Sequence, residues 1–199
     1  MTKKMMIIAG SAAAALLIGV LAWWLCSGNS KQAHIGDKIY LLKDNAVPMR
    51  LKVVTRSDGS AQVAVKFFDL DGKAVGRFEQ SYTGGSIHVS LLDVNIDGHH
   101  VYLPGAMTQY AKPDTLHMSL PQHYVKDGFP MIYNSQIADP KLHDEIGLLY
   151  ELVSSGEREK IETNSNRTVQ LIEITLNEPM ERVNYAVTTK TTGGAYFTN

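Results

Sequence analysis

The first 26 residues differ sharply from the rest of the chain in their pattern of apolar and polar positions. Residues 5–26 (MMIIAGSAAAALLIGVLAWWLC) contain no charged side chain and directly follow Lys3 and Lys4. As a helix this run would span about 33 Å, which matches the hydrocarbon core of a bilayer. Trp23 and Trp24 stand near one end, where aromatic side chains prefer the membrane interface. The pattern therefore predicts a single transmembrane anchor at residues 5–26, preceded by a short positive tail at residues 1–4.

Two other interpretations of this apolar run stay open. A cleaved signal peptide usually has a shorter apolar region and small side chains around its cleavage site, for which Cys26 and Gly28 are a poor match. A lipid anchor on Cys26 would need small residues directly before it, whereas Trp24 and Leu25 occupy those positions. Because positive flanks tend to stay in the cytoplasm, the bulk of the chain is expected on the other side of the membrane.

A small polar tether at residues 27–36 is followed by short runs in which apolar and polar residues alternate. Asp-Gly and Gly-Gly segments separate these runs, as is typical of turns between antiparallel strands. The pattern predicts a mainly β, antiparallel β-sandwich-like domain at residues 37–199, with an α+β domain as the alternative. The expected strands are residues 38–42, 50–56, 62–68, 74–82, 87–96 with a bulge at Leu92, 100–103, 115–120, 167–176 and 182–189. Loops are expected at residues 104–113 and 121–140, and residues 191–199 are either irregular or an edge strand.

The hydrophobic period changes once within this domain. Between residues 141 and 154, apolar side chains recur at helical spacing at Leu142, Ile146, Leu149 and Val153. Asp139 can cap the start of such a helix, and Pro140 suits its first turn. This stretch predicts one amphipathic helix that packs on an edge or end of the sandwich.

Composition and charge narrow the class of protein. Lys3 and Lys4 account for two of the 19 basic residues, which leaves 17 basic residues against 20 acidic ones. This slightly acidic balance predicts no nucleic-acid partner, because phosphate binding needs clustered Lys and Arg. The only cysteine is Cys26, so residues 37–199 can form no internal disulfide. Exported domains without disulfides are common in bacteria, which favours a bacterial inner-membrane protein with its C-terminal domain in the periplasm. An exported or lipid-anchored protein is the alternative localisation.

Metal-binding patterns are weak. The segment DVNIDG at residues 93–98 matches the first half of a calcium loop, but Pro104 stands where the bidentate carboxylate is required, so a hairpin turn is expected instead. The chain has seven histidines, and a site made of His88, one of the pair His99 and His100, and His117 is conceivable. Histidines exposed on strands and turns are the favoured interpretation, so no metal and no cofactor is predicted.

Catalytic motifs are also lacking in the sequence. It contains no G-x-S-x-G elbow and no S-x-x-K pattern at a credible helix start. The cluster His143, Asp144 and Glu145 suits the first turn of a helix, where acidic side chains favour the helix dipole. No catalytic residue is therefore predicted, and the sequence leans against an enzyme without deciding the matter, because carboxylate pairs can be assembled in space.

Aromatic and Met side chains concentrate in the middle of the chain, and such residues are favoured in the centres of protein interfaces. Packing over one end of the sandwich would explain them equally. The sequence predicts a membrane-anchored extracytoplasmic interaction or assembly subunit of a bacterial envelope complex, whose partners are the membrane and other envelope proteins. The alternative is an anchored envelope enzyme or small-ligand-binding domain with its site in residues 104–140. The candidate interaction surface consists of Tyr102, Met107, Tyr110, Tyr124, Phe129, Met131 and Tyr133.

Overall fold

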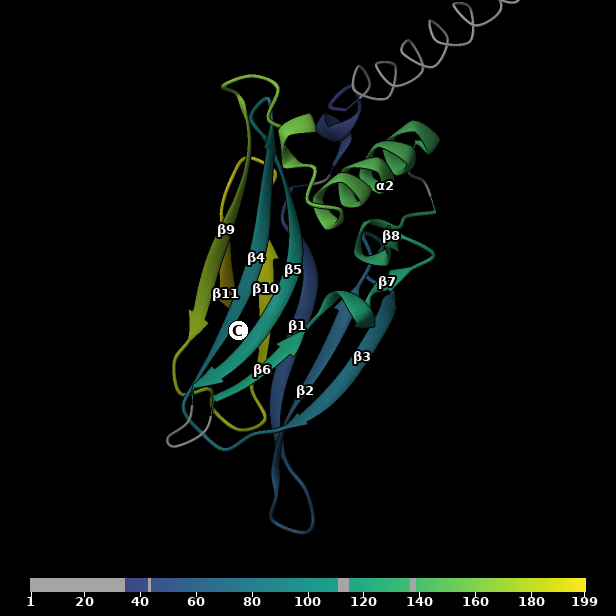
Figure 1. Cartoon of the computed structure of the whole chain (residues 1–199). Helices are drawn as coiled ribbons and strands as arrows, with labels where there is room; N and C mark the ends of the chain where they lie inside the picture. Colours follow the sequence, from purple (N-terminus) through teal and green to yellow (C-terminus); the bar gives the residue numbers. More distant parts are fainter. Residues whose placement is uncertain (1–34, 43, 111–114, 137–138) are drawn as a thin grey trace, which may run out of the picture. The chain divides into compact units, whose positions relative to one another are not determined.

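The structure is a computed structural model that describes residues 35–42, 44–110, 115–136 and 139–199 (Figure 1). The chain divides into two compact units, Met1–Ile35 and Gly36–Asn199, and the fold below is that of the second. The tail, the anchor at residues 5–26 and most of the tether lie outside the described residues. Within the described ranges, no helix has both the length and the apolar character needed to cross a membrane.

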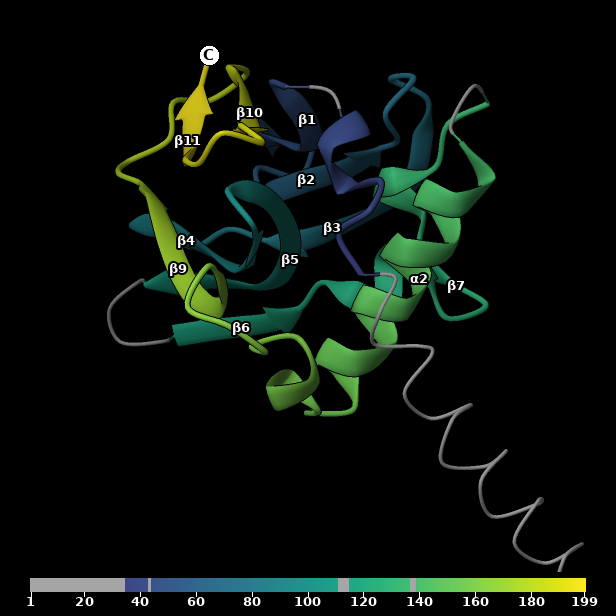
Figure 2. The same ribbon diagram turned by 90° about the horizontal axis from the view of Figure 1, so that it is seen from above.

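The second unit is mainly β, with antiparallel sheets and one α-helix, as the sequence predicts. One sheet has five strands in the order β11-β10-β1-β2-β3, and the other has four in the order β6-β5-β4-β9. Figures 1 and 2 show the two sheets as layers of a sandwich-like domain. The five-stranded sheet contains β1 (Ala46–Thr55), β2 (Ala61–Phe68), β3 (Ala74–Ser81), β10 (Asn184–Thr189) and β11 (Ala195–Thr198). The four-stranded sheet contains β4 (Ser86–Ile96), β5 (His99–Tyr110), β6 (Thr115–Ser119) and β9 (Arg167–Leu176).

Alternation along the strands gives each sheet one apolar face and one polar face. On β2, Val63, Val65 and Phe67 are fully buried, and on β4 the same is true of Val89 and Leu91. Removing these apolar side chains from water is the main force that holds the two sheets together. The side chains between them on the same strands therefore point away from the core and form the outer faces of the sandwich.

Three of the predicted local structures are wrong: a strand, a loop and the position of a bulge. Residues 38–42 do not form a strand, since Ile39–Leu41 is a short 3-10 helix, η1. The loop expected from residue 104 is instead a continuation of β5, which runs to Tyr110. Pro104 is tolerated there because the register shifts at this point: Ser90 faces Ala106 and Leu91 faces Pro104, which leaves the bulge on β5 rather than at Leu92.

The predicted helix is present as α2 (Pro140–Ser154) and lies at one end of the unit, beside β8 (Phe129–Pro130) and η1 (Figure 1). The Asp139 side chain caps it by accepting a hydrogen bond of 2.8 Å from the Lys141 amide. Buried Glu145 accepts hydrogen bonds from the amides of Gly36, at 3.3 Å, and Lys38, at 3.0 Å. This carboxylate thus joins the helix to the first described segment of the unit.

The remaining short elements surround this helix and the edges of the sheets. β7 (Val125–Lys126) pairs with β8, and three further 3-10 helices occur: η2 (Pro121–His123), η3 (Met131–Tyr133) and η4 (Arg158–Lys160). The final residues form β11 at the edge of the five-stranded sheet, which is one of the two outcomes expected for them.

Candidate functional site

Most of the predicted interaction residues lie inside the domain. Tyr110 is 49% exposed, and Met131 is partly exposed. The other five are at most 9% exposed: Tyr102, Met107, Tyr124, Phe129 and Tyr133. The surface that this set can offer to a partner is therefore limited to Tyr110 and part of Met131.

Two of the buried tyrosines complete the edge of β5. β6 pairs with β5 only from Ala106 onward, so the preceding part of β5 has no neighbouring strand on that side. The Tyr133 hydroxyl accepts a hydrogen bond of 2.7 Å from the Tyr102 amide and donates one of 2.9 Å to its carbonyl. The Tyr124 hydroxyl donates one of 2.9 Å to the Pro104 carbonyl. Burial raises the pKa of Tyr124 and of Tyr133 well above the usual range, so both stay neutral donors.

The histidines of the described ranges do not gather into a cluster of metal ligands. Among the described residues, no three His, Cys, Asp or Glu side chains lie close enough to hold a metal ion. His100 Nδ1 lies 2.7 Å from Asp93 Oδ1, and the other oxygen of that buried carboxylate accepts from Gln170 at 2.9 Å. His88 and His117 face the same side of the four-stranded sheet, with Thr108 between them in the register.

The half-match to a calcium loop is the turn of a hairpin, as expected. Residues 93–98 end β4 and lead directly into β5. Asp97 and Gly98 both have positive φ, and the Asn95 side chain accepts a hydrogen bond of 2.9 Å from the Gly98 amide. Asp97 also accepts a hydrogen bond of 2.8 Å from Arg167, so its carboxylate is already engaged.

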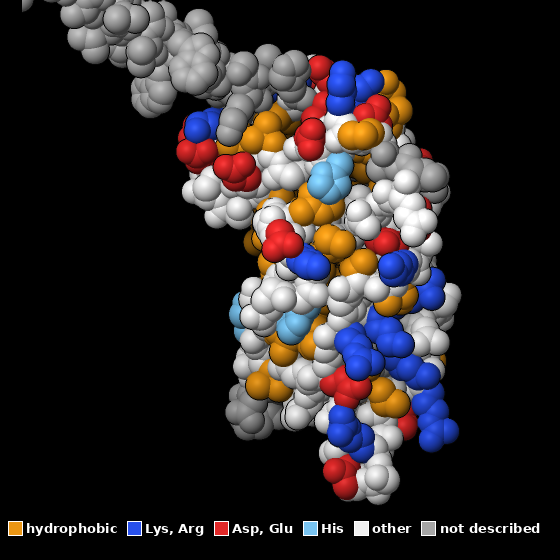
Figure 3. Space-filling model, turned by 90° about the vertical axis from the view of Figure 1, so that its right-hand side faces the viewer, with side chains coloured by type: hydrophobic (Ala, Val, Ile, Leu, Met, Phe, Trp, Pro, Cys, Tyr) orange, Lys and Arg blue, Asp and Glu red, His pale blue; other side chains and the backbone are white. Residues whose placement is uncertain are grey.

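A row of cations crosses the outer face of the five-stranded sheet. Arg50 on β1 lies directly opposite Lys66 on β2, which lies directly opposite Arg77 on β3. All three are exposed, and Lys52 stands two residues further along β1 on the same face. We call Arg50, Lys66 and Arg77 the cationic row. In Figure 3, Lys and Arg side chains gather along the lower part of this side of the molecule.

The cationic row is not neutralised within the domain. Among the described residues, no carboxylate forms an ion pair with Arg50, Lys66 or Arg77. The acidic residue on the same face, Glu79, pairs instead with Arg56. Like charges placed directly opposite on neighbouring strands repel one another, so this arrangement costs stability.

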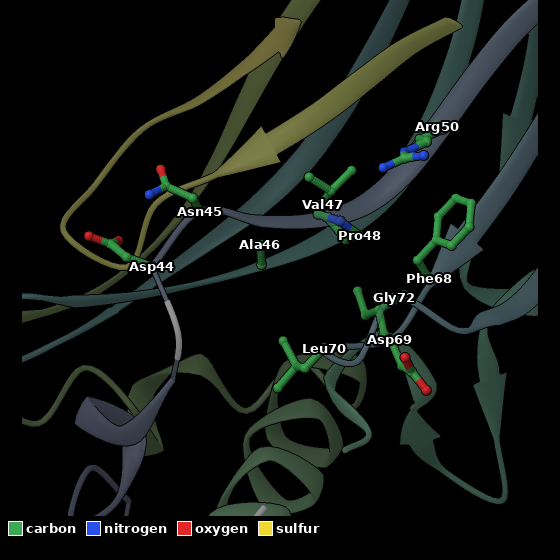
Figure 4. Close-up of a pocket in the computed structure, with 11 residues that line it drawn as sticks. Asp44, Asn45, Ala46, Val47, Pro48, Arg50, Phe68, Asp69, Leu70 and Gly72 are labelled. Atoms are coloured by element: carbon green, nitrogen blue, oxygen red, sulfur yellow. The ribbon is translucent and has the colours of Figure 1, made fainter. Parts of the chain in front are cut away.

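Two hollows meet at Arg50. Its guanidinium stacks over the Phe68 ring, 5.1 Å from the centroid, and these two side chains line both hollows. One hollow, of about 430 Å³, lies along the sheet face and is also lined by Lys52 and Lys66. The other, of about 280 Å³, is shown in Figure 4 and extends toward Asp44 and the β2–β3 turn.

The carboxylates of the second hollow serve the surrounding loops. Asp44 accepts hydrogen bonds of 2.8 and 2.9 Å from the amide and hydroxyl of Thr191, and the side-chain hydrogen bond is the main cause of its lowered pKa. Buried Asp69 accepts from the amides of Asp71, at 3.1 Å, and Lys73, at 2.8 Å. Arg50 is therefore the one charged side chain lining this hollow that forms no hydrogen bond or ion pair with a described residue; its contact is with the Phe68 ring.

The alternation of apolar and polar residues along the strands predicts that Arg50, Lys52, Lys66 and Arg77 point outward. It does not predict that Arg50, Lys66 and Arg77 lie directly opposite one another. Their alignment depends on the register of three strands, which the local pattern does not contain. Comparisons of the chain with protein-family models, with curated proteins and with solved structures find no match, so no relative supplies a function by similarity.

Proposed function

We propose that this protein is a membrane-anchored extracytoplasmic interaction or assembly subunit of a bacterial envelope complex, and that the cationic row docks an acidic segment of another envelope protein. The observation that carries the proposal is the direct alignment of Arg50, Lys66 and Arg77 without neutralising carboxylates. A domain with a net acidic balance keeps this repulsive arrangement at a cost, and an acidic partner would remove that cost.

The geometry of the face favours an extended acidic peptide. Arg50 of the row and Lys52, which lies outside the row on the same face, are alternate residues of one strand, so their Cα atoms are about 6.6 Å apart. Alternate carboxylates on an extended peptide have the same spacing. Phe68, stacked beneath Arg50, adds an apolar surface beside the charges, and such mixed surfaces are common where a side chain of a partner is seated.

The anchor supports the same proposal from the sequence. Residues 5–26 are long enough and apolar enough to span a bilayer, which would hold the domain close to other membrane components. An anchored enzyme or ligand-binding domain with its site in residues 104–140 is not favoured by the two hollows, since Ile132 is the one residue of that segment that lines either of them.

The test is co-purification of the full-length chain from native membranes in mild detergent. We expect stable protein partners that elute at about 1 M salt, where the screening length falls to about 3 Å. Lys66→Glu should lose these partners because it places a carboxylate in the middle of the row. Lys126→Glu, which reverses an exposed charge on β7, is the matched control and should retain them.

Three outcomes would overturn the proposal. They are recovery of a lone monomer from wild-type membranes, equal recovery of partners with Lys66→Glu and with wild type, and partners that are lost equally with the control. Release of the wild-type protein from membranes by alkaline carbonate would separately reject the anchor.

A further inference from the structure

A chain of three hydrogen-bonding side chains lies on the outer face of the four-stranded sheet. Ser86 Oγ is 2.9 Å from His88 Nε2, and His88 Nδ1 is 2.8 Å from Glu173 Oε1. Ser86 and His88 are alternate residues of β4 and so share one face, while Glu173 comes from the neighbouring strand β9. The three side chains are thus connected in the order hydroxyl, imidazole, carboxylate.

The hydrogen bonds determine the direction of this chain. An ionised carboxylate only accepts hydrogen bonds, so His88 Nδ1 carries a proton and donates it to Glu173, with the Thr175 hydroxyl also within 3.1 Å of this nitrogen. In a neutral imidazole the other nitrogen, Nε2, is then an acceptor, and the Ser86 hydroxyl donates to it. This is the arrangement in which an imidazole acts as general base toward a serine nucleophile.

The surroundings of Ser86 supply two further features. Gly84 and Gly85 precede it with φ of 98° and 79°, a conformation that suits glycine, and their amide N–H groups donate no hydrogen bond to any described residue. Backbone amides beside a nucleophile are the kind of group that can stabilise an oxyanion. Tyr110 faces Ser86 across the strands, is 49% exposed, and its ring meets the His88 ring edge-on at 4.5 Å.

We propose that Ser86, His88 and Glu173 form a serine esterase site. Ser86 Oγ attacks the carbonyl carbon of a carboxylic ester while His88 Nε2 takes the hydroxyl proton. The bond to the leaving alkoxide breaks as His88 returns this proton to it, releasing an alcohol and leaving an acyl group on Ser86. A water molecule then attacks the acyl carbonyl while His88 takes its proton, and the bond to Ser86 Oγ breaks as His88 returns that proton to Oγ, releasing the carboxylic acid. Ser86 and His88 are the catalytic residues, and Glu173 is a positioning residue that orients the imidazole.

The exposure of the site indicates the class of substrate. The side chain of Glu173 is 48% exposed, so water screens its interaction with His88 and limits the stabilisation of charge in the transition state. Such a site suits esters, whose alkoxide leaves more readily than the amine of an amide. The two hollows described above lie on the other sheet, so a substrate would reach Ser86 on an open sheet face. Esters displayed on a larger molecule fit this access, with Tyr110 as an apolar contact for the acyl group.

The test uses the full-length protein in detergent, a fluorophosphonate probe and 4-nitrophenyl acetate. We expect covalent labelling of the wild type, with the adduct located on Ser86 by mass spectrometry, and ester hydrolysis above the rate of buffer. Ser86→Ala should abolish both, and His88→Ala should lower the hydrolysis rate at least about 100-fold. Glu173→Gln should lower kcat about fivefold and leave KM unchanged, because it acts through the imidazole of His88.

Ser90→Ala is the matched control, since Ser90 lies on the same strand and face, opposite Glu173 in the register, and its side chain makes none of these hydrogen bonds. It should be labelled as the wild type is. An unlabelled wild type, an adduct on another residue, or equal labelling of Ser86→Ala and wild type would each overturn the proposal. Mapping the adduct on the wild type keeps the test independent of whether a variant folds. The site does not involve the cationic row, so Lys66→Glu should leave labelling unchanged.

Discussion

Gly76 shows how closely two segments of backbone approach each other in this domain. It lies on β3, and a Cβ at this position would clash directly with the backbone carbonyl of His123 in η2. The close approach of β3 and η2 also brings two rings together, since His123 stacks on Phe78 at a centroid distance of 4.4 Å. The absence of a side chain at this glycine is therefore a packing requirement.

Gly76→Ala is expected to lower the free energy of unfolding by about 3 kcal/mol or more, because a backbone carbonyl cannot move aside as a flexible side chain can. Urea denaturation followed by circular dichroism measures the change. Gly147→Ala is the control: its Cβ would lie 3.6 Å from the Phe129 ring, an ordinary contact, and it should stabilise α2 by about 0.5–1 kcal/mol. Equal stability of Gly76→Ala and wild type would contradict the packing seen between β3 and η2.

At the same scale, the sequence predicted the character of the central aromatic residues but not their positions. Tyr124 and Tyr133 have the amphipathic form that suits an interface, and the same form suits a buried site where the hydroxyl finds a partner. Their partners are backbone groups of Tyr102 and Pro104. These backbone groups of β5 need side-chain partners because β6 is shorter than β5 and leaves them unpaired, which only the complete sheet reveals.

At the scale of elements, the row across β1, β2 and β3 connects stability to the proposed function. Lys66 has Arg50 on one side and Arg77 on the other, so a carboxylate in its place would face a cation across each neighbouring strand. Lys66→Glu is therefore expected to raise the free energy of unfolding by about 0.5–1 kcal/mol at low salt. Chemical denaturation at low and high salt measures this gain, which salt should diminish.

A variant that is more stable and yet loses its partner cannot owe that loss to unfolding. The opposite result, in which Lys66→Glu is less stable than wild type at low salt, would show that the three cations do not repel one another. Lys66→Gln separates the two contributions, because it removes the repulsion without adding an attraction and should give an intermediate stability.

Elements with local signals were predicted well from the sequence. The helix at Pro140–Ser154 has its apolar period, its cap and its first-turn proline within one short stretch, and the strands around the Asp-Gly turns are equally self-contained. The wrong predictions fall where contacts with residues distant in the sequence determine the local structure. The expected strand at residues 38–42 is instead the short 3-10 helix Ile39–Leu41, and buried Glu145 of α2 accepts a hydrogen bond from the amide of Lys38 just before it. Pro104 continues a strand because the bulge at that point requires no amide donor from it.

At the scale of the whole molecule, the buried tyrosines make stability depend on pH in the alkaline range. Burial raises the pKa of Tyr133 and Tyr124 above 10.0, the ordinary value that they regain in the unfolded chain. Above that pH the folded protein holds protons that the unfolded chain releases, so the contribution of these two tyrosines to stability is constant below about pH 10 and falls as the pH rises further.

The fall should amount to about 1 kcal/mol per buried tyrosine between about pH 10 and pH 11, measured by urea denaturation at a series of pH values. Tyr133→Phe should be less stable than wild type at neutral pH, because the Tyr102 backbone groups lose their partner. Its stability should nevertheless fall less steeply above pH 10. An identical alkaline slope in variant and wild type would contradict the assignment to Tyr133.

The fold class was predictable because strand alternation and turn residues are repeated along the whole domain. The sites were not, because each is made by register between strands. Ser86 and His88 are neighbours in the sequence, but Glu173 joins them only through the pairing of β4 with β9. The cationic row likewise depends on two pairings, β1 with β2 and β2 with β3, and the local sequence pattern predicts neither register.

The two hydrogen bonds that the Glu145 carboxylate accepts from the amides of Gly36 and Lys38 have a mechanical consequence. If the proposed anchor at residues 5–26 holds the protein at a membrane, a pull on it would reach this domain through the segment around Gly36, where the amides of Gly36 and Lys38 both donate to this one carboxylate on α2. Both bonds would be loaded together, so part of the load would pass into the helix before it reaches the first strand of the sheet. The faces proposed to bind a partner and to cleave esters would then stay undistorted while the tether is under tension.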